Sequence, residues 1–153
     1  MADLRVLFSE LIRLETELWN AVDARLRSEH ELPLSWFEPM HVMSKYPACR
    51  ILDLKKELSI TVGGASKLVD RIEAAGLCRR RTNPDDGRSQ LIELTPTGRR
   101  VLAQADKTFE DELRTRLESV VSGPALDQFT ATLRRLRTAH RLVTSSEEIS
   151  PTS

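Results

Sequence analysis

The stretch from Thr61 to Arg99 decides the fold of this chain, and it reads TVGGASKLVDRIEAAGLCRRRTNPDDGRSQLIELTPTGR. Its first third has apolar residues at the i, i+3, i+4, i+7 spacing of a one-sided helix, at Ala65, Leu68, Val69 and Ile72. The Thr61 hydroxyl can cap this helix, and Gly76 stands where a helix ends in the left-handed conformation. The face opposite the apolar residues is small, polar or basic. This pattern is typical of a helix that enters the major groove of DNA.

A basic β-hairpin is predicted directly after this helix. Two short strands, Leu77–Thr82 and Gln90–Leu94, flank a run of turn-forming residues at 83–89. Three arginines load the first strand with positive charge, and a fourth follows the turn. Thr95-Pro96 then has the form of a helix start, with a capping residue before a proline. Helix, helix, basic hairpin and helix is the order of a winged helix-turn-helix.

Three segments of this stretch, LVDRIEAAGLCRRR, NPDDGRS and LTPTGR, carry a family resemblance. Together they resemble the MarR (multiple antibiotic resistance regulator) family of dimeric bacterial transcription factors. In that family the wing tip carries an Asp-x-Arg pattern, which Asp86-Gly87-Arg88 matches. The resemblance covers the middle third of the chain. It departs at Gly63 and Gly64, where relatives often carry side chains, so no operator sequence is transferred from it.

Long amphipathic helices are predicted on both sides of the central stretch. We expect the second helix to be capped by Ser35 and to be broken or bent near Pro39, and a short third helix over 51–58. We expect a mainly α (α+β) fold with 153 residues in a single domain, in which a winged helix-turn-helix region spans 35–98. The terminal helices, 3–28 and 96–143, have apolar stripes too long for the central region to cover. They are therefore predicted to be dimerisation helices.

The charge of the chain is balanced overall but uneven along its length. Residues 50–100 hold eleven Lys and Arg against seven Asp and Glu, whereas residues 1–49 hold five against eight. A local excess sets the field at a binding face, so the zero net charge does not argue against nucleic acid. The N-terminus lacks a basic start, and no apolar run approaches about 18 residues. These features predict a cytoplasmic protein without a membrane partner.

The sequence contains no pattern that indicates catalysis. It has no nucleophile–base pair, metal cluster or Gly-rich phosphate loop, and the histidines at 30, 41 and 140 stand apart. Cys49 and Cys78 form neither a disulfide framework nor a zinc motif. Relatives that sense oxidants carry their cysteine in the first long helix, where this chain has none. We therefore expect no enzyme, no cofactor and no metal, with Cys78 as a small buried residue.

The function expected from these features is sequence-specific binding of double-stranded DNA by a homodimer. A two-fold symmetric protein matches a palindromic operator. The resemblance implies a transcriptional regulator of repressor type that occupies promoter DNA. The predicted DNA-binding residues are Thr61, Gly63, Gly64, Ser66, Lys67, Arg71, Arg79, Arg80, Arg81 and Arg88.

Each basic group among these residues also has a purely structural interpretation. Lys67 and Arg71 can pair with carboxylates along their own helix. The three strand arginines can form a solvated face, and Arg88 can pair with Asp86 or Asp85 to stiffen the turn. The corresponding alternative function is a winged-helix protein-interaction module without DNA binding.

A small effector is the last partner that the resemblance implies. Many relatives bind phenolic or other aromatic acids in a cleft between the dimer helices and the winged helix. The residues expected to border such a cleft here are Trp19, Trp36, His41 and Asp53. Ordinary roles compete with this one: Trp19 can be an interface aromatic, and Asp53 suits a helix N-terminus for electrostatic reasons.

Overall fold

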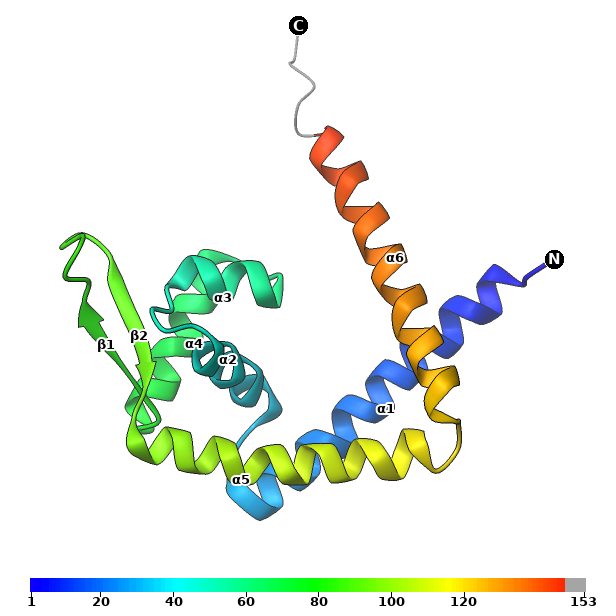
Figure 1. The fold of residues 1–153 in the computed structure, drawn as a ribbon, viewed down its shortest axis with the longest axis horizontal. Coiled ribbons are helices and arrows are strands. Elements are labelled where there is room, and N and C mark those ends of the chain that lie inside the picture. The colour runs from blue at the N-terminus through cyan, green and yellow to red at the C-terminus, as the bar shows by residue number, and fades with distance from the viewer. Residues whose placement is uncertain (148–153) are drawn as a thin grey trace, which may run out of the picture. The chain divides into compact units, whose positions relative to one another are not determined.

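The computed structural model describes residues 1–147, with side chains through residue 143, and it has the predicted mainly helical winged helix-turn-helix fold (Figure 1). In order the elements are α1 (Leu4–His30), α2 (Leu34–Lys45), α3 (Ile51–Leu58), α4 (Val62–Ala74), β1 (Cys78–Thr82), β2 (Gln90–Leu94), α5 (Pro96–Leu113), the π-helical turn η1 (Arg114–Glu118) and α6 (Gly123–Glu147). The chain divides into two compact units, Met1–Glu112 and Leu113–Ser153. The first unit contains the winged helix-turn-helix.

The wing is the predicted antiparallel hairpin of β1 and β2. Its register pairs Cys78 with Leu94 and Arg80 with Ile92. The segment before α3 adds an isolated bridge on the other edge of β2, where the Ile92 amide donates to the Cys49 carbonyl at 2.8 Å. The wing is therefore anchored to the start of α3 as well as to α4.

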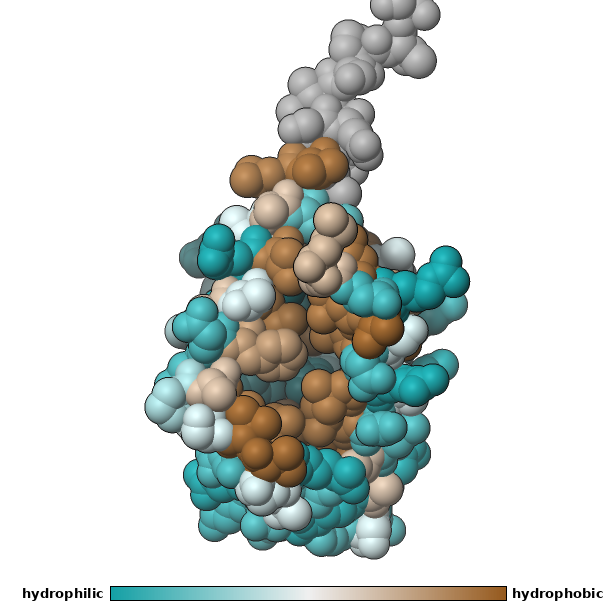
Figure 2. Space-filling model, turned by 90° about the vertical axis from the view of Figure 1, so that its right-hand side faces the viewer, coloured by the Kyte–Doolittle hydropathy of each residue, from teal (hydrophilic) through white to brown (hydrophobic). Residues whose placement is uncertain are grey.

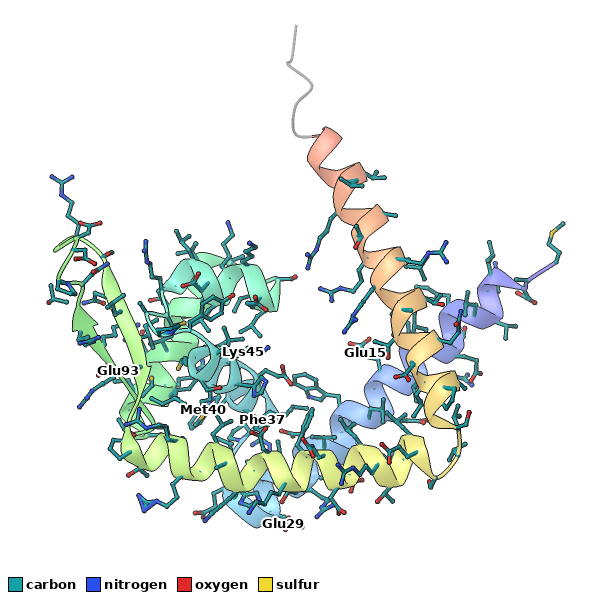
Figure 3. All side chains as sticks on the ribbon, in the orientation of Figure 1. Glu15, Glu29, Phe37, Met40, Lys45 and Glu93 are labelled. Carbon is teal, nitrogen blue, oxygen red and sulfur yellow. The ribbon has the colours of Figure 1, made fainter. Side chains whose placement is uncertain are left out.

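The core of the first unit lies where α2, α4 and the wing meet the second half of α1. Its fully buried side chains include Leu26, Phe37, Met40, Leu54, Val69, Ile72 and Ile92. Phe37 stacks on Phe109 of α5 with ring centroids 4.8 Å apart. Figure 3 shows Phe37 and Met40 projecting from α2 on its side toward α5. α2 is thus the central helix of this unit.

The start of α2 corrects one sequence prediction. The N-cap is Pro33 rather than Ser35, and no side chain of the cap residue bonds to the helix. Asp23 of α1 supplies the missing capping bond, because its carboxylate accepts the Leu34 amide at 2.9 Å. A tertiary contact therefore determines where this helix begins. Pro39 lies inside the helix and does not break it.

The end of α1 is held against α5 by a chain of polar side chains. α1 continues to His30, beyond the predicted end at residue 28, and stops at Glu31 in the left-handed conformation. The Thr108 hydroxyl, which is 8% exposed, donates to Glu29 at 2.9 Å. His30 Nε2 lies 2.7 Å from the same hydroxyl. Since a hydroxyl has a single proton, His30 is the donor in this second bond.

The start of α5 is fixed by a cap and a close backbone approach. The Thr95 hydroxyl accepts the Gly98 amide at 3.0 Å, so the predicted cap is confirmed. It also donates to the Gly76 carbonyl at 2.6 Å. A Cβ at Gly98 would lie 1.9 Å from the Leu77 carbonyl oxygen, so no other residue fits there. This contact places the first turn of α5 directly against the base of the wing.

The terminal helices expose long apolar stripes. In α1, Leu4, Leu7 and Phe8 are 72%, 56% and 66% exposed, whereas Val22 and Leu26 near the other end are buried. In the second unit no side chain within residues 113–143 is fully buried, and α6 exposes Phe129 and Leu136. Many side chains on the surface facing the viewer in Figure 2 are correspondingly apolar. None of the helices described is both long and apolar enough to cross a membrane.

Candidate nucleic-acid interface

Helix α4 presents a buried apolar face and an exposed polar one, as its sequence predicts. Ala65, Val69 and Ile72 are fully buried, while Lys67 and Arg71 are exposed. The Thr61 hydroxyl accepts the Gly64 amide at 3.0 Å and caps the helix. Gly76, just past its end, has φ 77°, the left-handed value expected of a helix stop. The predicted cap and stop are both confirmed.

The first turn of α4 contains two glycines and is open to solvent. A Cβ added to Gly63 would meet nothing within 4 Å, whereas one on Gly64 would lie 3.1 Å from the Thr61 hydroxyl oxygen. Packing within the protein therefore does not require glycine at position 63. Val62, which the sequence interpretation passed over, is 46% exposed in the same turn. Here the backbone can come close to a bound molecule.

Arg80 turns inward from the wing and joins it to α4. Its guanidinium lies 2.7 Å from Asp70 and 3.2 Å from Glu73, and it donates to the Ser66 carbonyl at 3.2 Å. Its backbone amide donates to Glu73 at 2.7 Å, and its side chain is only 17% exposed. The strand alternation indicates this direction, because Arg80 shares a sheet face with buried Cys78. Arg80 thus fixes the angle between wing and helix.

The other two strand arginines share one carboxylate on the opposite face of the wing. Arg79 Nε donates to Glu93 at 2.6 Å, and Arg81 Nε lies 3.4 Å from the other oxygen of Glu93. Figure 3 marks Glu93 on the wing among these side chains. The hydrogen bond from Arg79 lowers the pKa of the Glu93 carboxyl. Both arginine side chains remain more than half exposed, at 60% and 52%.

The uncompensated cations of the interface lie on α4 and at the wing tip. Asp70 and Glu73 bind Arg80 rather than Lys67 or Arg71, and within the described residues neither of the latter is in an ion pair. At the tip, Asp86 accepts the backbone amide of Arg88 at 3.0 Å. The Arg88 guanidinium has no ion pair among the residues described. Asp86 therefore shapes the turn, and the charge of Arg88 is free to meet an anion.

A set of hydrogen bonds around the buried Asn83 shapes the wing tip. Asn83, 6% exposed, donates to the Ser89 hydroxyl at 3.0 Å and accepts the Asp85 amide at 3.0 Å. The Ser89 amide in turn donates to the Asp86 carbonyl at 3.1 Å. These bonds hold Arg88 at the outer end of the hairpin.

Comparison with known proteins agrees with this architecture. Residues 39–90 match the sequence profile of the MarR family. MarR of Escherichia coli is 28% identical over 117 residues, which cover 72% of this chain and 81% of that protein. MarR of Salmonella typhimurium is 33% identical over 66 residues, 43% of this chain and 46% of that protein, so the match spans about half the length of that relative. Over residues 39–90 the chain is therefore similar to the MarR family.

Solved structures of MarR proteins share the fold. A MarR family regulator from Streptomyces coelicolor in complex with DNA superposes with a TM-score of 0.84 at 23% identity, covering 91% of this chain and 88% of that one. A MarR variant from Escherichia coli in complex with operator DNA superposes at 0.78 with 20% identity, covering 88% and 96%. At these identities the likeness establishes the fold alone.

The four residues expected at an effector cleft of this protein are not joined to one another. Within the described residues no hydrogen bond, ion pair or ring contact connects any two of them. The Asp53 carboxylate accepts the Arg50 amide at 2.8 Å, which is its ordinary role at the start of α3. Trp19 is 46% exposed on α1, and Trp36 is half-buried on α2. Their participation in ligand binding stays a prediction.

His41 differs from the other three in having an unsatisfied buried atom. Its Nδ1 has no hydrogen-bond partner and lies 3.9 Å from Asp106 of α5, while its ring stacks near Phe37 with centroids 6.2 Å apart. A nitrogen in this state can bind a ligand's acidic group.

The two cysteines of the chain are poorly suited to thiolate chemistry. Burial raises the pKa of Cys49 to about 12 and that of Cys78 to about 11. A thiol needs a lowered pKa and access to react. Cys78 is a small buried residue, as predicted. No cluster of three or more potential metal ligands occurs in the described part of the chain.

Proposed function

We propose that this protein is a homodimeric transcriptional regulator that binds a palindromic operator in double-stranded DNA and acts as a repressor. The observation that carries the proposal is the free positive charge at two separate points, on the exposed face of α4 and at the wing tip. The spacing of a helix and a hairpin joined rigidly by Arg80 suits adjacent major and minor grooves. The DNA-bound MarR relatives support the same assignment.

In this proposal each predicted DNA-binding residue has a defined role. Thr61, Gly63, Gly64, Ser66 and Lys67 face bases and adjacent phosphates in the major groove, while Arg71, Arg79 and Arg81 meet the backbone and Arg88 enters the flanking minor groove. Arg80 contributes to the backbone contact chiefly by holding the wing, because its own charge is neutralised by Asp70 and Glu73. Most of the affinity for DNA then comes from Lys67, Arg71 and Arg88, which form no ion pair among the described residues, rather than from the three consecutive arginines of β1.

The proposal is tested by selecting duplexes from a random pool and titrating them at several salt concentrations. Log affinity should fall steeply with log salt, because several phosphates are neutralised per dimer. Arg88→Ala should weaken binding most on sites with A·T-rich flanks, where the minor groove is narrow. Arg88→Lys should recover only part of the loss. An absence of salt-dependent binding to any duplex would favour a protein-interaction module instead.

Release by a small aromatic acid is the finer part of this proposal. The buried Nδ1 of His41 and the accessible indole rings of Trp19 and Trp36 offer a donor or acceptor and apolar faces. Benzoate added to the protein–DNA complex should release DNA, and His41→Phe should remove that response while leaving DNA binding unchanged. Equal release from both proteins would show that His41 does not bind the acid.

A further inference from the structure

A groove of about 550 Å³ lies between the first turn of α3 and the wing. Its walls are residues 50–52 on one side and, on the other, Thr82 with residues 86–90 of the wing tip. Two exposed guanidinium groups, those of Arg50 and Arg88, border it from opposite walls. Neither forms an ion pair within the described residues, and the Asp86 carboxylate in the groove already accepts an amide of the turn. Two positive charges without an ion-pair partner among the described residues therefore border the groove.

Arg50 occupies a position where helix stability favours a different residue. It is the N-cap of α3, and its side chain makes no capping bond. N-caps favour Ser, Thr, Asp or Asn because their side chains accept first-turn amides, which an arginine cannot do. A side-chain bond at this end of the helix runs the other way: the Arg50 backbone amide donates to the Asp53 carboxylate at 2.8 Å. A residue that breaks a local rule without structural gain points to function.

The shape and charge of the groove match one strand of duplex DNA. Leu52, 62% exposed, lies in the wall beside Arg50 and offers an apolar surface for a deoxyribose ring. Arg88 is the residue proposed above to enter the minor groove of the DNA. The DNA strand that borders the minor groove would then lie next to the base of the Arg88 side chain. We propose that Arg50 and the α3–wing groove bind the sugar-phosphate strand that borders the minor groove. This inference rests on the proposed DNA-binding function and adds a contact outside α4 and the wing arginines.

The test compares Arg50→Ser with Arg100→Ser, which removes the same group from an exposed position on α5. The serine at position 50 introduces a favoured N-cap, so the variant should melt at or above the wild-type temperature. Its DNA affinity should fall about tenfold per half-site near 100 mM salt. The slope of log affinity against log salt concentration should become less steep by about 1 per half-site. Arg50→Lys should retain most of the affinity, since a phosphate also binds a point charge. Arg100→Ser should bind as the wild type does.

The loss should be equal on the selected operator and on an unrelated duplex, because a phosphate contact carries no sequence information. A loss confined to one sequence would show a base contact and overturn the inference. A wild-type affinity and slope for Arg50→Ser would also overturn it, while leaving the proposed function intact. A wild-type protein that binds no duplex at low salt would instead overturn the proposed function, and this inference with it.

Discussion

Among single residues, Gly63 offers a test of whether DNA binding and stability oppose each other at the proposed interface. Alanine there would raise helix propensity by about 0.5–1 kcal/mol, and its methyl group would meet nothing within 4 Å. We expect Gly63→Ala to raise the melting temperature and to weaken DNA binding, because the methyl group would stand between the helix backbone and the bases. Thermal unfolding and DNA titration of the same sample measure both effects.

Gly64→Ala is the matched control for this experiment. Its Cβ would crowd the capping hydroxyl of Thr61 at 3.1 Å, so the stability gain should shrink or disappear. If Gly63→Ala bound DNA as tightly as the wild type, the open space at position 63 would have no role in recognition.

Arg80 and Arg81 are neighbours in sequence with opposite structural roles. Arg80→Ala removes bonds to Asp70, Glu73 and Ser66 from a side chain that is 17% exposed, so it should lower the free energy of unfolding by roughly 1–2 kcal/mol. Arg81→Ala loses only an exposed pair with Glu93 and should cost less than about 0.5 kcal/mol. Urea unfolding of both variants distinguishes them. Equal losses of unfolding free energy in the two variants would contradict the structural role assigned to Arg80, which is to join the wing to α4.

Local signals in the sequence predicted the residues whose partners are near in the chain. Thr61 and Thr95 cap their helices and Gly76 ends α4, because each acts on amides or carbonyls within a few residues or on its own backbone conformation. Arg50 was missed, since its groove forms only when the wing folds back beside α3. Partners of this kind depend on tertiary geometry that spacing along the chain does not encode.

At the level of elements, the junction of α1 with α5 depends on one buried hydroxyl. Thr108 links Glu29 and His30, and Arg25 continues the chain of bonds to Asp111 at 2.7 Å. The hydrogen bonds from Arg25 and then Thr108 lower the pKa of the Glu29 carboxyl, so Glu29 stays charged at neutral pH. Figure 3 marks Glu29 at this end of α1.

Thr108→Val keeps the shape of the side chain but removes its hydroxyl. It should lower the free energy of unfolding by about 1–2 kcal/mol, because His30 loses its acceptor and Glu29 loses a donor. Thr108→Ser, which keeps the hydroxyl, should lose less, and denaturant titration gives both values. A fully stable valine variant would show that solvent replaces these bonds without cost.

Element boundaries were predicted well where one helix carries its own signals and poorly where a neighbour intervenes. α3 and β2 have the predicted bounds, and α5 begins at Pro96 as predicted. The start of α2 was wrong because Asp23 lies on another helix and still caps it. Within the terminal helical region predicted over 96–143, α5 ends at Leu113, where the π-helical turn η1 follows. Nothing in the hydrophobic spacing indicates that turn.

At the scale of the whole molecule, the exposed apolar residues of α1 and of α6 support the proposed dimer. Large exposed apolar patches on proteins often mark interaction surfaces. The exposed residues of α1 lie at its far end from the winged helix-turn-helix, where Leu7 and Leu11 are 56% and 39% exposed. A second copy of the same chain presents the same stripes and would bury them with two-fold symmetry. Burial of these residues would supply the free energy for the proposed dimer.

Leu11→Arg places a charge in this predicted seam and should dissociate the dimer, since an unpaired buried charge costs several kcal/mol. Sedimentation at micromolar concentration should give about twice the chain mass of 17.3 kDa for the wild type and the single mass for the variant. Leu52→Arg is the control for sedimentation, because this leucine is even more exposed, at 62% against 39% for Leu11, but lies on α3. The monomeric variant should also lose its preference for half-sites about 10 bp apart, because only a dimer spans both. A variant that sediments as a monomer yet still selects such repeats would show that DNA, rather than the apolar seam, pairs the two copies.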